Sequence, residues 1–153
     1  MIDRIDWSER DSQTYAPAMK TMFRVLLALF MVLAGLNHFR EPQPYVAMMP
    51  PMLPAPLALV YLSGIAEAVL GLGLLHARTR RLAAWGLILL FVAVFPANIN
   101  MAVHHIPLGD HPVPTWALWA RLPLQAVLIL WAYWFTRPDA DAPARVSVAS
   151  ASR

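Results

Sequence analysis

The sequence predicts an all-α integral membrane protein, a single four-helix bundle, and two observations carry this prediction. The 153 residues are 59% hydrophobic and only 14% charged, with a mean hydropathy of +0.52. A soluble domain carries about 25% charged residues, so this chain lacks the polar surface that it would need in water. In addition, four apolar segments are each long enough to cross a bilayer, and polar or proline-rich stretches separate them.

The amino-terminal part of the chain is expected to hold a tail, one span and a loop. Residues 1–20 mix acidic and basic side chains with little periodicity, so we expect a solvated tail with at most a short helix. The first span follows at 21–39. A signal peptide is disfavoured there, because the preceding tail is acidic and no A-x-A cleavage site follows. The loop at 40–56 contains six prolines, which resist helix interiors. Its apolar residues predict that it lies on the membrane surface or folds over the mouth of the bundle.

The other three spans are expected at 56–76, 82–103 and 116–135. Pro96 should kink the third span, because proline lacks a backbone N–H and its ring clashes with the preceding turn. The residues after the fourth span are rich in Ala, Ser, Pro and Asp and are expected to be disordered. The chain is thus divided into a cytoplasmic tail, a transmembrane domain and a second cytoplasmic tail, at 1–20, 21–136 and 137–153.

The distribution of Lys and Arg predicts how the helices are oriented. Cytoplasmic loops of membrane proteins carry an excess of these residues. Here they gather at the amino-terminal end of the first span, in the turn between the second and third spans, and after the fourth: Lys20, Arg24, Arg78, Arg80, Arg81 and Arg137. Both termini are therefore expected in the cytoplasm, with the proline-rich loop on the outer side.

Polar residues inside the apolar segments predict one buried site. Glu67 lies near the middle of the second span, where a charge is costly unless it is paired or protonated. We counted depth from the outer face at about 1.5 Å per residue. Each span then contributes a polar group to the outer half of the bilayer, while the inner half is nearly all hydrocarbon. The polar groups are His38, Glu67, Asn98, Arg121 and Gln125. Scattered structural residues would not cluster by depth, so we predict a polar pocket that opens outward.

Arg121 is the expected partner of Glu67. Its guanidinium can reach toward the midplane and stays charged at any working pH. Gly64 and Gly71, one turn from Glu67, would let a neighbouring helix approach closely. Two interpretations remain open: a structural ion pair that fixes helix order, or a pocket that binds a small ligand such as a quinone head group. His38 borders the cluster, where it could relay a proton, donate to a ligand or cap the first helix.

The sequence also bears on other kinds of chemistry. Without cysteine there is no disulfide, no thiolate nucleophile and no cysteine-based zinc or iron–sulfur site. Histidines and methionines in two loops could be drawn as copper ligands. These residues are His104, His105, His111, Met48, Met49 and Met52. Their spacing matches no specific metal motif, so no metal site is predicted. Motifs of nucleotide-binding proteins, serine hydrolases and metalloproteases do not occur. The cations flank apolar segments, which argues against a nucleic-acid surface.

An ordered set of short motifs resembles the DoxX-like family of small membrane proteins. The set runs from about residue 26 to 135. It consists of Asn37-His38-Phe39, Pro50 and Pro54, Ser63-Gly64-x-x-Glu67, Gly71-x-Gly73-Leu74-Leu75, Thr79-Arg80-Arg81, Pro96-Ala97-Asn98 and Arg121-Leu122-Pro123-Leu124-Gln125. Each motif alone is weak, whereas their common order is fairly specific.

The resemblance implies a four-helix bundle in the bacterial inner membrane. Members of that family include the quinone-reducing subunit of a thiosulfate oxidoreductase and a protein that helps to mature a periplasmic amine dehydrogenase. The resemblance thus implies that the protein is an accessory or quinone-linked subunit of a membrane redox complex. Its expected partners are another protein of that complex and a quinone as cofactor. The site positions that it implies are His38, Glu67, Asn98, Arg121 and Gln125.

Two other functions stay open at this point. In a non-catalytic scaffold or assembly factor, the cluster of Glu67 and Arg121 would be structural, and the proline-rich loop or a helix face would bind a partner protein. A proton-coupled transporter is less favoured, because a lone four-helix unit has no inverted repeat.

Overall fold

The computed structural model is all-α and describes residues 7–107 and 113–137, with side chains from residue 18 onward. Its helices are α1 (Trp7–Arg40), α2 (Gln43–Ala47), α3 (Pro56–Leu75), α4 (Arg80–Val103) and α5 (Thr115–Trp134). The described ranges contain no strand. Four helices include a stretch long and apolar enough to cross a membrane, which in α1 is Ala18–Arg40. The protein therefore has the form of a multi-pass helical membrane protein.

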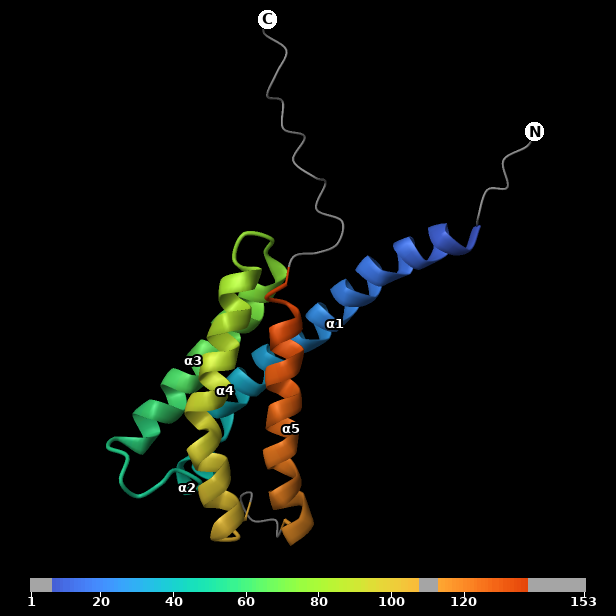
Figure 1. Ribbon diagram of the computed structural model, residues 1–153. Coiled ribbons are helices and arrows are strands. Elements are labelled where there is room, and N and C mark those ends of the chain that lie inside the picture. The colour runs from blue at the N-terminus through green and yellow to red at the C-terminus, as the bar shows by residue number, and fades with distance from the viewer. Residues whose placement is uncertain (1–6, 108–112, 138–153) are drawn as a thin grey trace, which may run out of the picture.

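The spanning helices lie close to the apolar segments of the sequence, and the main difference is at the amino terminus. α3, α4 and α5 each begin and end within two residues of the expected bounds. The expectation of at most a short helix in residues 1–20 is wrong, because α1 already begins at Trp7 and projects beyond the other helices (Figure 1). Extending a formed helix costs little once its nucleus exists. The disordered tail predicted after residue 137 lies outside the described residues.

α1 and α3 pack along a stripe of glycines. A Cβ atom added to Gly35 would meet the backbone oxygen of Gly64 and would lie 2.9 Å from the backbone nitrogen of Ala68. A Cβ atom on Gly64 would lie 2.7 Å from the Cβ atom of His38. In lipid no hydrophobic force drives helices together, so close packing of small residues supplies much of the attraction. The stripe brings the last turn of α1 against the middle of α3.

The remaining helices complete an open bundle. α3 also packs on α4, and α4 packs on α5 (Figure 1). α1 and α5 meet near the beginning of the α1 span, where the ring of Phe23 lies 6.1 Å from that of Trp131 and 5.9 Å from that of Trp134. In the described residues these two helices have no extensive backbone contact. The side of the bundle between α1 and α5 is therefore the least closely packed.

The loop after α1 lies over one end of the bundle. The ring of Tyr45 in α2 stacks on the imidazole of His38 at 3.8 Å, and its hydroxyl accepts a hydrogen bond from Asn37 Nδ2 at 2.9 Å. Met48 is buried, and its carbonyl accepts a hydrogen bond from Asn100 Nδ2 of α4 at 3.1 Å. These contacts hold α2 and Met48 against α1 and α4.

Replacing Asn100 by alanine is expected to loosen this loop. The change leaves the Met48 carbonyl without its side-chain donor, and an unsatisfied buried polar group costs about 1–3 kcal/mol. Hydrogen–deuterium exchange over 43–49 should then rise about tenfold. Asn37→Ala removes an exposed hydrogen bond to the same loop and serves as the milder comparison. Exchange that stays at the wild-type rate in Asn100→Ala would contradict this account of how the loop is held.

Candidate functional site

A cavity of about 330 Å³ lies within the bundle. All four spanning helices and the loop after α1 line it, and most of the lining side chains are apolar. The volume falls in the range of small-molecule sites, about 300–1,000 Å³. Its polar lining residues are His38, Tyr45, Ser63, Glu67, Asn98, Arg121 and Gln125. The structure thus brings all five of the site residues predicted from the sequence to one cavity.

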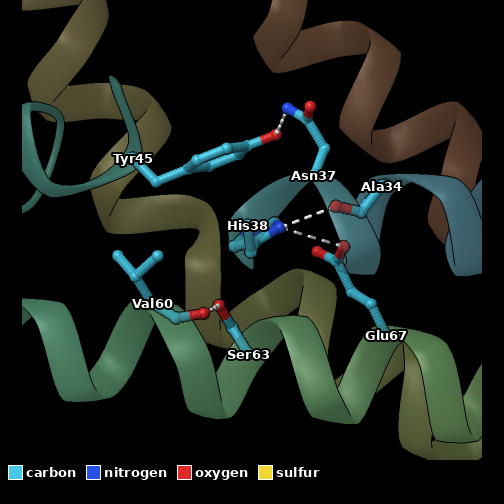
Figure 2. A network of polar contacts seen from close by, with 7 residues as sticks. All are labelled: Ala34, Asn37, His38, Tyr45, Val60, Ser63 and Glu67. Atoms are coloured by element: carbon cyan, nitrogen blue, oxygen red, sulfur yellow. Dashed lines mark hydrogen bonds and ion pairs between the residues drawn. The ribbon is translucent and has the colours of Figure 1, made fainter. Parts of the chain in front are cut away.

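Glu67 faces His38 (Figure 2). The Oε2 atom of Glu67 lies 3.6 Å from Nδ1 of His38, and both side chains are buried. His38 Nδ1 donates a hydrogen bond to the carbonyl of Ala34 at 2.8 Å, which places the ring hydrogen on this nitrogen. A separation of 3.6 Å is too long for a hydrogen bond. The Oε2 atom of Glu67 is accordingly buried without a hydrogen-bond partner among the described residues.

Arg121 is held by α4 instead of by a carboxylate. Its Nη1 atom donates to the sulfur of Met101 at 3.3 Å, and a thioether is a weak acceptor. The expected ion pair between Glu67 and Arg121 is therefore wrong for the described residues. The physical reason is the glycine stripe, which places His38 of α1 against Glu67, while the guanidinium packs on α4. Two ionisable groups thus line one cavity without satisfying each other.

Asn98 and Gln125 bond to each other and to the backbone of α4. Asn98 Nδ2 donates to Oε1 of Gln125, and Nε2 of Gln125 donates to the carbonyl of Phe91. The bond to Phe91 ties α5 to the backbone of α4 five residues before Pro96. These two of the five predicted residues therefore have a structural task.

The contact between α1 and α3 that places His38 beside Glu67 was not predicted from the sequence. A signal for it is present in the sequence. Gly35 precedes His38 by three residues, and Gly64 precedes Glu67 by the same spacing. Because residues three apart share one helix face, a small residue beside a polar one on two helices indicates close packing that brings the polar groups together. Tyr45 was also missed, because its place over His38 depends on the path of the loop.

No cluster of three or more histidine, aspartate or glutamate side chains that could hold a metal ion occurs within the described residues. The Nδ1 atom of His104 donates to the carbonyl of Asn100 at 3.0 Å, and Met52 is 86% exposed. His111, weighed above as a copper ligand, lies outside the described residues. The contacts seen thus give no support to a copper site in these loops.

These features define a class: small multi-pass helical membrane proteins with a partly polar cavity lined by four spanning helices. Within it, the chain belongs to the family described as a domain of unknown function (DUF8561), whose model matches residues 27–136. The match includes every polar residue that lines the cavity. No curated protein and no solved structure matches the chain. The resemblance to the DoxX-like family rests on sequence motifs and stays a prediction.

Proposed function

We propose that this protein binds the head group of a quinone in its cavity and acts as an accessory or quinone-linked subunit of a membrane redox system. The observation that carries the proposal is that Glu67 and Arg121 line one cavity without pairing with each other. A carboxylate oxygen without a hydrogen bond, and a guanidinium held by a thioether, are costly in an apolar span. A ligand that complements both groups would lower that cost.

A quinone meets this requirement. Its carbonyl oxygens accept hydrogen bonds, so the guanidinium of Arg121 would donate to one of them. Glu67 in its protonated form would donate to the other. The flat apolar ring suits the hydrophobic part of the lining, which includes Phe30, Met31, Val60, Phe91 and Leu128. A quinone head group therefore matches both the polar and the apolar part of the cavity.

The same arrangement suits proton transfer. Reduction of a quinone to the quinol adds two electrons and two protons. Glu67 would give one proton to a ring oxygen, and the second proton would reach the other ring oxygen together with the electrons. The electrons would come from a redox partner, which we expect to be another protein of the same membrane complex.

The orientation and location form part of the proposal. The distribution of Lys and Arg favours both termini in the cytoplasm, and the DoxX-like resemblance favours the bacterial inner membrane. Glu67 and the loop over the cavity would then lie toward the outer side of the bilayer.

A non-catalytic scaffold or assembly factor is the second candidate, and one observation favours it. The hydrogen bonds of Asn98, Gln125 and Asn100 all serve to fix backbone segments. If Glu67 and His38 had the same purpose, the cavity would need no ligand, and the protein would instead retain a stable protein partner after purification.

Organic extraction and mass spectrometry of the protein, purified in mild detergent from its native membranes, separates the two candidates. We expect about one quinone per chain in the wild type and its loss in Glu67→Leu and in Arg121→Met, because each variant removes one of the two polar contacts. Glu41→Leu and Arg40→Met make the same changes at an exposed pair, with Nε and Oε1 3.9 Å apart, and should keep the quinone. A wild-type protein without quinone, or equal quinone content in all variants, would contradict the proposal.

A further inference from the structure

Two side chains that line the cavity are also exposed on the outside of the bundle. Phe30 of α1 is 50% exposed and Leu124 of α5 is 55% exposed. The other lining residues are buried or half-buried. Both exposed residues lie near the middle of their spans, Ala18–Arg40 and Thr115–Trp134. They also belong to the two helices that lack extensive backbone contact in the described residues. The cavity therefore opens sideways, between α1 and α5, at the depth of the lipid chains.

Packed side chains close the two ends of the bundle. At one end Tyr45 stacks on His38, and Met48 is buried beneath the loop. At the other end Phe23 packs edge-on against Trp131, and Lys20 Nζ donates to the carbonyl of Arg137 at 3.2 Å. A ligand that entered from either end would have to displace these contacts. The sideways opening, in contrast, is bordered by side chains that can rotate.

The chemistry of the opening indicates what passes through it. Phe30 and Leu124 are apolar, and the half-buried residues that line the cavity include the apolar Val94 and Leu128. A site for a water-soluble ligand would present polar groups at its mouth. Here the polar groups lie inside the cavity and the apolar groups lie at its mouth. This arrangement matches an amphipathic ligand whose polar head lies inside and whose apolar tail lies at the mouth.

We propose that the cavity takes its ligand directly from the bilayer, through a portal between Phe30 and Leu124. The ligand is then an amphipathic lipid-soluble molecule. Its polar head lies beside Glu67 and Arg121, and its apolar chain passes the portal into the surrounding lipid. This inference rests on the proposed function, since a quinone with an isoprenoid chain is such a molecule. It adds the route of entry and the position of the chain.

Photolabelling in lipid nanodiscs tests where the chain lies. The probe is a benzoquinone whose alkyl chain carries a diazirine, and the labelled peptides are mapped by mass spectrometry with and without excess decyl-benzoquinone. We expect label that excess quinone removes, on α1 and α5 around Phe30 and Leu124. Competed label on the loop at 42–49, with none on α1 and α5, overturns the portal while leaving quinone binding intact. Label that nothing competes overturns both proposals.

The rate of uptake provides a second test. Phe30→Trp combined with Leu124→Trp narrows the portal and should slow the approach to full labelling about tenfold. Leu33→Trp combined with Leu130→Trp makes matched changes on the same helices, at residues 57% and 67% exposed that do not line the cavity. This control should label at the wild-type rate. Equal rates in both double variants overturn the portal.

Discussion

Replacing Glu67 by leucine is expected to abolish quinone binding and, at the same time, to leave the ligand-free protein as stable as the wild type or more stable. The Oε2 atom of Glu67 is buried without a hydrogen bond, and its nearest ionisable neighbour, His38 Nδ1, lies 3.6 Å away. His38 already donates this hydrogen to Ala34. The imidazole can therefore stay neutral in the variant, and the substitution leaves no unpaired charge behind.

The expected size of this effect follows from the cost of a poorly satisfied buried charge. Replacement of buried ion pairs by apolar side chains of similar volume is neutral or stabilising by about 1–4 kcal/mol. We expect Glu67→Leu to raise the free energy of unfolding of the quinone-free protein by about 0–2 kcal/mol. Thermal unfolding in detergent after removal of quinone measures the change, with Glu41→Leu at an exposed position as control.

The sign of this change distinguishes the two candidate functions. If a residue is kept for ligand binding at the expense of stability, replacing it raises the free energy of unfolding. If a residue is kept to hold the helices together, replacing it lowers the free energy of unfolding. A loss of more than about 1 kcal/mol in Glu67→Leu, with no loss in the control, would therefore favour the scaffold and contradict the binding site.

Gly35→Ala is expected to cause the largest loss of stability. The added Cβ would meet the backbone oxygen of Gly64 and the backbone nitrogen of Ala68, and neither can move without separating α1 from α3. Overpacking of this kind costs about 1–3 kcal/mol and occasionally more. Because the same contact places His38 beside Glu67, the variant should also lose quinone.

Gly86→Ala is the matched control for this prediction. Its Cβ would lie 2.6 Å from Cδ2 of Leu70, the far end of a flexible side chain that can rotate away. The better helix propensity of alanine, up to about 1 kcal/mol, offsets any remaining cost. Thermal unfolding of both variants should show a large loss at Gly35 and little change at Gly86. Equal losses would mean that the close approach of α1 and α3 is not what stabilises the bundle.

The spanning helices were predictable because their signal is local. An uncharged apolar run of sufficient length has few alternatives to a membrane helix, and prolines ended the runs clearly. The helical start of α1 at Trp7 was missed for a related reason. Residues 7–17 show little apolar periodicity of their own, and they extend the helix of the following span toward the amino terminus.

The candidate site was predictable in part. Depth along each helix is a one-dimensional quantity, and counting it grouped the five polar residues that line the cavity. The partner of Glu67 depends instead on how closely two helices pack and on which faces meet. Arg121 appeared suitable by charge and reach, but the contact between Gly35 and Gly64 decided in favour of His38. The sideways opening depends on the missing contact between α1 and α5, for which we found no sequence signal.

The most direct test of the quinone site is to measure, by calorimetry, the equilibrium binding of decyl-benzoquinone to the purified, quinone-free protein in nanodiscs. Glu67→Leu and Arg121→Met should each weaken binding at least about tenfold, which corresponds to about 1.4 kcal/mol for the loss of one hydrogen bond to the ligand. Glu41→Leu and Arg40→Met should bind as the wild type does. Saturable binding with this pattern is the result that we predict. Absence of saturable binding, or one affinity shared by all five proteins, would contradict a quinone site formed by Glu67 and Arg121.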